Sequence, residues 1–282
     1  MYFAQLLILG LLAGAVLSLV AIGFTLVIGV GKIANFAHGA FVAGGMYLGY
    51  EAYVAWHISP YLTLLPALAF FALVGWAVAE VFEQRGRKVG EVGELLVGLA
   101  LLLLINGLLE VAFTDNPRSL TGVNIGSLSV TGISIPWTEL VAAIFTFAVA
   151  GGLHVLVRTS RWGRAMRATA EDPVVAGLQG IRVPIVQRMA VTLSIVVAGL
   201  AGVIIAPFTV LTPSAGTTFL ISAFAVVVLG GIGSTAGAVL AGLAIGIIDS
   251  MAAGYLSSYW TTLAPLLIIL GYLLIRPNRV TT

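Results

Sequence analysis

The sequence predicts an all-α, polytopic membrane protein. Its 282 residues are 60% hydrophobic and only 9% charged, whereas a soluble protein of this length needs far more charged surface. Glycine is abundant, with 34 residues, as is typical where membrane helices pack closely. Apolar runs of about 20 residues, the length that crosses roughly 30 Å of hydrocarbon as a helix, recur along the whole chain.

The first apolar run covers residues 3–30. It is too long for a cleavable signal peptide, and no Lys or Arg precedes it, so we expect it to be retained. Further single runs lie at 33–56, 61–82, 92–114, 137–157 and 185–207.

The last third of the chain leaves the number of spans open. The tract 217–254 is interrupted by GGIGST at 230–235, and a final run lies near 260–275. Counting the tract as one span with a re-entrant piece gives eight transmembrane helices, and counting it as two gives nine. Broken helices are expected near 31–39 and 230–237, and residues 1–282 are expected to form a single transmembrane domain.

The basic residues predict the orientation. The loops near 32, 83–91 and 158–188 and the tail after 275 hold 12 of the 13 Lys and Arg residues, leaving only Arg118. Because such loops stay in the cytoplasm, we expect an outside N-terminus and a cytoplasmic C-terminus, which favours nine crossings. The outer loop 115–136, rich in Gly, Ser, Thr and β-branched residues, is expected to hold a short hairpin.

Several functions are excluded by what the sequence lacks. There is no cysteine for disulfides or thiolate chemistry, the histidines at 38, 57 and 154 show no metal-ligand spacing, and no basic cluster with aromatics suggests nucleic acid. The GVGK stretch is not a phosphate-binding loop, because Leu26 and Ile33 occupy its first Gly and its Ser/Thr positions. We therefore expect no cofactor in this chain, and any ATP must be bound by another chain.

Two hexapeptides suggest an internal repeat. GAFVAG at 39–44 matches GAVLAG at 237–242, and each follows a glycine-rich turn. At the same spacing Glu51 corresponds to Asp249. A parallel repeat and a chance match in a Gly- and Ala-rich chain are both open interpretations.

Polar residues inside apolar runs are the candidates for a transport path, because they are costly in lipid and usually face a bundle interior or water. Asn35 and His38 share one helix face, as do Asn106 and Glu110. Each pair either lines the path or forms hydrogen bonds that hold helices together. Glu51 and Asp249, near outer helix ends, either dock an external binding protein or are ordinary interfacial acids.

The loop 158–188 is predicted to hold a short helix over 173–179. Asp172 before Pro173 is a helix start, and Gly180 is a stop. The helix carries Val174, Val175 and Leu178 on one side and is too short to be stable alone. A stripe of Arg161, Arg164 and Arg167 precedes it. The stripe suits anionic lipid, but the length of the loop favours docking to a cytoplasmic partner.

Three motifs carry a resemblance over nearly the whole chain: GKIANFAHGAF, RWGRAMRATAEDPVVAGLQGI and AVVVLGGIGSTAGAVLAG. The chain resembles the LivH-like permease subunit of ABC importers for branched-chain amino acids. The resemblance implies a second permease chain, identical or related, two cytoplasmic ATPase subunits, an extracytoplasmic solute-binding protein and a location in the bacterial inner membrane. It also implies that the region from Glu171 to Gly177 couples the permease to the ATPases.

One position departs from this pattern. Many relatives carry an acid after the His-Gly pair where this chain has Ala40, so the cargo is left as branched-chain amino acids or a related small polar solute such as urea or an amide. The alternative function is a secondary transporter driven by an ion gradient, which usually needs acids near the bilayer centre. An intramembrane enzyme is disfavoured, because neither H-E-x-x-H nor G-x-S-x-G is present.

Overall fold

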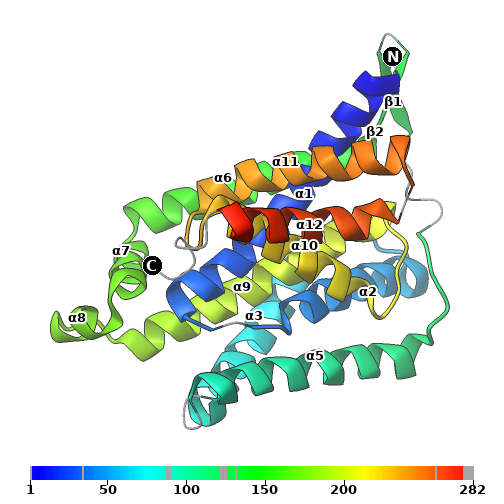
Figure 1. The fold of residues 1–282 in the computed structure, drawn as a ribbon. Helices are drawn as coiled ribbons and strands as arrows, with labels where there is room; N and C mark the ends of the chain where they lie inside the picture. The colour runs from blue at the N-terminus through cyan, green and yellow to red at the C-terminus, as the bar shows by residue number, and fades with distance from the viewer. Residues whose placement is uncertain are drawn as a thin grey trace.

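Two helices that are apolar on every side over most of their length form the centre of the fold (Figure 1). The computed structural model describes residues 2–33, 35–86, 90–120, 123, 126–130, 132–257 and 259–275. The first central helix is α1 (Tyr2–Leu26), which continues as a π-helical segment over Val27–Gly31, and the second is α9 (Val183–Ile205). A helix without a polar face is expected to be surrounded by other helices, and α1 and α9 are contacted by most of the bundle.

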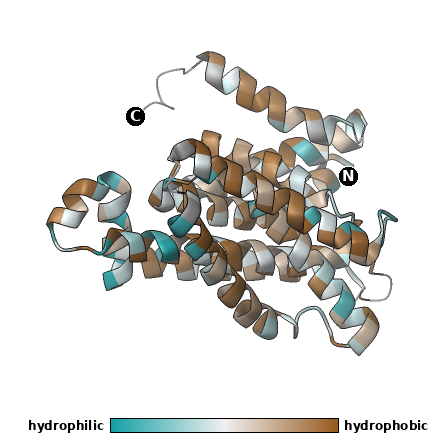
Figure 2. Cartoon of the chain, turned by 90° about the horizontal axis from the view of Figure 1, so that it is seen from below, coloured by the Kyte–Doolittle hydropathy of each residue, from teal (hydrophilic) through white to brown (hydrophobic). Residues whose placement is uncertain are grey.

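The other long helices pack around this pair. They are α2 (His38–Trp56), α3 (Leu64–Val81), α5 (Glu91–Phe113), α6 (Trp137–Thr159), α10 (Ala215–Gly230), α11 (Thr235–Tyr255) and α12 (Trp260–Ile275). Two short helices, α7 (Arg161–Glu171) and α8 (Pro173–Leu178), project from one end of the bundle. Apolar residues cover the length of the bundle, and hydrophilic residues gather mainly towards its ends (Figure 2).

Six helical stretches of the described chain are long and apolar enough to cross a membrane. They are Tyr2–Gly31, Leu64–Gln84, Val92–Phe113, Trp137–Thr159, Val183–Phe208 and Thr235–Tyr255. The all-α class is confirmed, but the predicted count of eight or nine spans is not. The helix α2 contains His38 and Glu51 and is less apolar, and α10 and α12 have only 16 residues each.

Both predicted helix breaks are present. Residues 32, 33 and 35–37 lie outside the helices, and Lys32 adopts a left-handed conformation (φ 57°) that closes the first helix. Between α10 and α11 the turn is made by Gly231 (φ 88°) and Gly233 (φ 83°), conformations that cost glycine little. The two repeated hexapeptides therefore both lie near the start of a helix after a break, but α2 packs on α9 whereas α11 packs on α1.

The predicted hairpin is confirmed. Strands β1 (Ser127–Val130) and β2 (Ile133–Pro136) pair antiparallel, with Leu128 opposite Ile135. The Gln5 side chain of α1 holds the hairpin through two hydrogen bonds, at 2.6 and 2.9 Å, to the backbone of Ser134. The hairpin lies at the end of the bundle opposite α7 and α8 (Figure 1).

Arg118, the basic residue outside the four basic segments, has a structural role. It lies in the loop between α5 and the hairpin, its side chain donates to the Phe113 carbonyl (2.8 Å), and its backbone pairs with Leu211. The guanidinium also lies over the rings of Tyr50 and Phe113, 5.4 and 5.3 Å from their centres. These contacts hold the loop that follows α5 against α2. They give Arg118 a structural role, which explains why this one basic residue lies outside the four basic segments.

Candidate functional site

One histidine joins the start of α2 to both central helices. His38 is fully buried, with Nδ1 3.0 Å from the Ser194 hydroxyl of α9 and Nε2 3.0 Å from the Val20 carbonyl oxygen of α1. Because a carbonyl only accepts, Nε2 carries the proton and Nδ1 accepts from the serine. This arrangement favours the packing alternative for His38 over lining a path.

Asn35 forms the turn before α2. It is fully buried, its Oδ1 accepts from the Ala37 backbone N–H (3.0 Å), and its carbonyl accepts from the His38 N–H (3.1 Å). Such a side chain–backbone turn is a common way to start a helix. Its Nδ2 has no hydrogen-bond partner among the residues that the structure describes.

The contact between His38 and Ser194 is expected to contribute to stability as a pair. Exchanging His38→Leu and Ser194→Ala singly and together should give a coupling free energy of about 0.5–1.5 kcal/mol, the range for hydrogen bonds between membrane helices. Thermal unfolding in detergent measures it. The His38→Leu and Ser222→Ala pair, which share no hydrogen bond, should be additive. Additivity of the first pair as well would show that the hydrogen bond contributes nothing.

Asn106 and Glu110 lie on α5, whose surface is mostly uncovered by the rest of the chain. Glu110 is exposed, and the buried Asn106 Oδ1 has no hydrogen-bond partner in the described structure. A cavity of about 550 Å³ between α2, α3 and α5 is lined mainly by apolar side chains and includes Glu51. The candidate docking residue Glu51 thus lines this cavity between helices.

The predicted loop helix exists as α8, and its ends are formed by the expected residues. Asp172 Oδ1 accepts from the backbone N–H groups of Val174 (2.8 Å) and Val175 (3.1 Å). Gly180 (φ 83°) follows the last turn. Together with α7, which begins at the Ser160 cap over Gly163, this helix forms a projecting elbow, defined here as residues 160–180.

The three arginines of the stripe are exposed on α7, but two of them also have an intramolecular role. Arg164 donates to the Thr159 carbonyl (3.1 Å), and Arg167 donates to the Val157 carbonyl. These are carbonyls of the last turn of α6, where cations are favourable because of the helix dipole. Arg161 makes no side-chain hydrogen bond within the described residues.

The apolar side of α8 has no cover in the single chain. Leu178 is 84% exposed and Val174 is 71% exposed, whereas Ala176 on the other side is buried. The elbow is thus a positively charged projection with an apolar tip, and Gly177 lies in that tip with open space around its α-carbon. This is the geometry of a contact surface for another protein.

Removing the Asp172 cap is expected to loosen α8. Asp172→Ala should cost about 1 kcal/mol of helix stability, and the amides of Val174 and Val175 should exchange with solvent several-fold faster. Hydrogen exchange read out by mass spectrometry on peptides covering 168–182 measures this. The neighbouring exposed Glu171→Ala, which makes no such bonds, is the control, and equal exchange in both variants would contradict the role of the cap.

A partly buried ion pair fixes α9, the helix that follows the elbow. Arg188 of α9 places Nε and a terminal nitrogen 2.9 and 2.7 Å from the carboxylate of Glu83, which lies in the π-helical segment Phe82–Gly86 after α3. The Arg188 guanidinium lies 5.0 Å from the centre of the Trp76 ring. Neither residue was predicted as functional. The signal in the sequence is an acid and a base at the ends of two different spans, which does not identify the partner.

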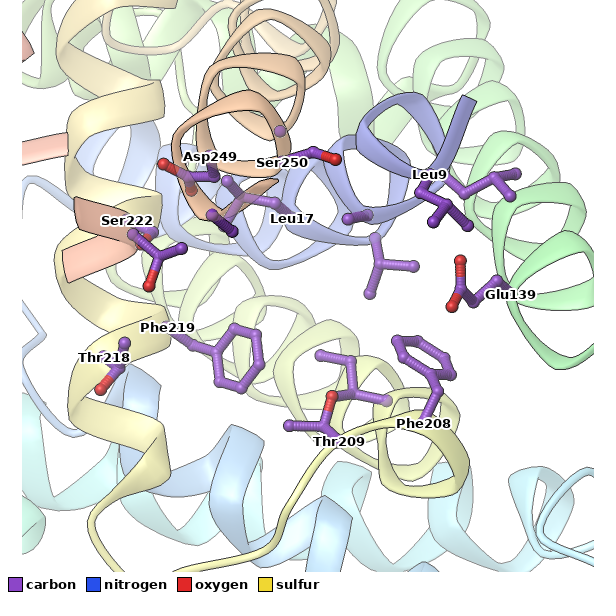
Figure 3. A pocket seen from close by; sticks show the side chains of 17 residues that line it. Leu9, Leu17, Glu139, Phe208, Thr209, Thr218, Phe219, Ser222, Asp249 and Ser250 are labelled. Atoms are coloured by element: carbon purple, nitrogen blue, oxygen red, sulfur yellow. The ribbon is translucent and has the colours of Figure 1, made fainter. Parts of the chain in front are cut away.

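A second cavity, of about 410 Å³, lies among α1, α6, α10 and α11 (Figure 3). Asp249 of α11 and Glu139 of the first turn of α6 both line it, together with the hydroxyls of Ser222 and Thr218. Asp249 was expected near an outer helix end, where it could dock a binding protein. In the structure its side chain lines this cavity. Glu139 was missed, although an acid within the apolar run 137–157 is itself a signal.

Comparison with known proteins gives a consistent result. Residues 6–275 match the family model described as the permease component of the branched-chain amino acid transport system. The chain is 29% identical to the high-affinity branched-chain amino acid transport system permease protein LivH of Salmonella typhimurium, covering 99% of this chain and 96% of the relative. It is 27% identical to BraD of Pseudomonas aeruginosa, another such permease protein, over 99% and 95% of the two chains.

Relatives extend to the archaea, and the fold is present in a solved structure. A probable branched-chain amino acid transport permease of Methanocaldococcus jannaschii is 28% identical, over 94% of this chain and 88% of the relative. The fold matches a chain of PsaBC from Streptococcus pneumoniae in complex with Fab, with a TM-score of 0.55 and 14% identity over 97% and 91% of the chains.

Proposed function

The chain belongs to the family of branched-chain amino acid transport permeases, and on that premise we propose that it forms the membrane path of an ATP-driven importer. The cargo is a branched-chain amino acid or a related small polar solute. A zwitterion needs a lined route because an unpaired charge is costly in hydrocarbon. The names of the relatives support this function over a secondary transporter driven by an ion gradient.

The observation that carries the proposal is the elbow. A capped helix with an uncovered apolar side, carried on a cationic helix beyond the long apolar spans, is what a permease needs to receive movement from another protein. We propose that two ATP-binding subunits contact this elbow and bind all of the ATP that the importer uses. A second permease chain and an extracytoplasmic solute-binding protein complete the assembly.

The topology follows from the same assignment. We propose that α2, α10 and α12 also cross the membrane, which gives nine spans. The N-terminus is then outside and the C-terminus cytoplasmic, in the inner membrane of a bacterium. Support comes from the arrangement of the bundle, in which α7 and α8 project at one end and the hairpin lies at the other (Figure 1).

The roles of single residues along the path stay predictions. Asn106 and Glu110 are the stronger candidates for contact with solute, because α5 presents them on a helix that the rest of the chain leaves largely uncovered. Asn35 and His38 are weaker candidates because both are fully buried. Docking of the binding protein by Glu51 and Asp249 also stays a prediction.

The decisive experiment is reconstitution. The purified chain in liposomes with its co-purified ATPase and binding-protein partners should accumulate labelled leucine only when ATP is supplied on the ATPase side. The chain alone should accumulate none, with or without a sodium or proton gradient. Uphill uptake by the chain alone on an ion gradient would overturn the proposed function.

A further inference from the structure

The ionisable side chains that line the cavity among α1, α6, α10 and α11 are all of one sign. Its two ionisable side chains, Asp249 and Glu139, are acids from different helices, and none of the described residues that line it is Lys, Arg or His. Figure 3 shows the two carboxyl groups on opposite sides of the space. In a cavity with apolar walls, such charges concentrate the local field and attract cations.

The acids also lack partners. Within the described structure, Asp249 Oδ1 is buried and accepts no hydrogen bond, and neither acid forms an ion pair. A buried carboxylate without a partner is unfavourable, so a bound cation that donates hydrogen bonds would stabilise the site. Ser222, which is only 9% exposed and has no side-chain hydrogen bond in the described residues, adds an oxygen acceptor to the same lining.

The rest of the lining suits hydrocarbon. Leu9 and Leu17 of α1 and the rings of Phe208 and Phe219 face the same space (Figure 3). Aromatic rings attract ammonium groups as well as alkyl groups, so a bare metal ion would leave most of this lining unused. The volume of about 410 Å³ holds a small organic molecule.

We propose that this cavity binds a primary alkylammonium, whose ammonium pairs with one of the two acids, Asp249 or Glu139, and whose hydrocarbon packs on the leucine and phenylalanine wall between them. Two sources have this chemistry: the amino-acid cargo, which rests on the proposed function, and a free amine, which does not. The binding itself is a property of the isolated chain and is independent of ATPase coupling.

The absence of cysteine allows a direct test. Ala253→Cys places a single thiol in the cavity lining, one turn after Asp249. In nanodiscs containing the full chain, its modification by a trimethylammonium methanethiosulfonate should exceed that by the sulfonate analogue roughly 10-fold, after normalisation to a free thiol. The same ratio should be near one at Ser129→Cys, an exposed site on β1.

Ligands distinguish the chemistry and its source. The ion 3-methylbutylammonium should slow modification at Ala253→Cys several-fold, whereas 3-methylbutan-1-ol, which has the same hydrocarbon without the charge, should not. Protection by leucine identifies the cargo as a source, and protection by the amine alone identifies a free amine. Equal protection by amine and alcohol would overturn the proposal, because it would show an apolar pocket only.

Charge removal completes the test. Asp249→Asn combined with Glu139→Gln should abolish both the rate ratio and the protection, while Glu51→Gln, in the separate cavity beside α5, should change neither. An unchanged midpoint of thermal unfolding in detergent verifies that the double variant is folded. A rate ratio that survives the double substitution would also overturn the proposal, whether or not ATP-driven uptake is observed.

Discussion

Leu178→Asp is expected to reduce ATP-driven uptake to background while the chain still inserts and folds. Leu178 is 84% exposed at the tip of the elbow, so a polar residue there costs the isolated chain little. In contact with an ATPase the same side chain would be buried, and the substitution would lose about 1.5–3 kcal/mol of apolar burial and add the cost of a buried carboxylate. Subunit contact should weaken by roughly 30-fold or more.

Uptake of labelled leucine in vesicles containing all subunits measures the loss, and co-purification of the ATPases locates its cause. Gln179→Asp is the matched control, because it places the same charge one residue further along, outside the apolar side of α8. Leu178→Met should retain uptake. Normal uptake by Leu178→Asp would mean that α8 is not where the ATPases act, since a subunit can drive the permease only through contacts that differ between its states.

Local chemistry made the helix α8 of the elbow predictable from the sequence. Asp172 and Pro173 specify a helix start by the hydrogen bonds they can and cannot make, and the helix ends at Leu178, one residue before the predicted end. The helix breaks before α2 and α11 follow in the same way from glycine-rich stretches in apolar runs. Each of these signals lies within a few residues of the feature it predicts.

Contacts between distant segments were not predictable. The partner of His38 is Ser194, 156 residues away in sequence, and nothing in either segment identifies the other. The same holds for the pairing of Arg188 with Glu83 and for the cavity that Glu139 and Asp249 share. Apolar periodicity gives the spans but not their neighbours, because helices that are apolar all round have no face that points to a partner.

Gly45→Ala is expected to destabilise the fold strongly, whereas Gly44→Ala, one residue earlier on α2, is not. A β-carbon at position 44 meets nothing within 4 Å, and Ala is favoured over Gly in a helix by about 1 kcal/mol. A β-carbon at position 45 would fall on the carbonyl oxygen of Gly199 in α9. Because both atoms belong to helix backbones, the clash is relieved only if the two helices separate.

The helix α9 has no room to retreat, because the Phe71 ring of α3 already occupies the space where a β-carbon of Gly199 would lie. We therefore expect Gly45→Ala to cost about 3 kcal/mol, the upper range for an overpacked core, and Gly44→Ala to leave stability unchanged or slightly higher. Denaturation of the two purified variants in the same detergent compares them directly. Equal stability would mean that the backbones of α2 and α9 are not in contact at this point. It would contradict the central packing described above, because apolar helices in lipid depend on close approach through glycine to stay together.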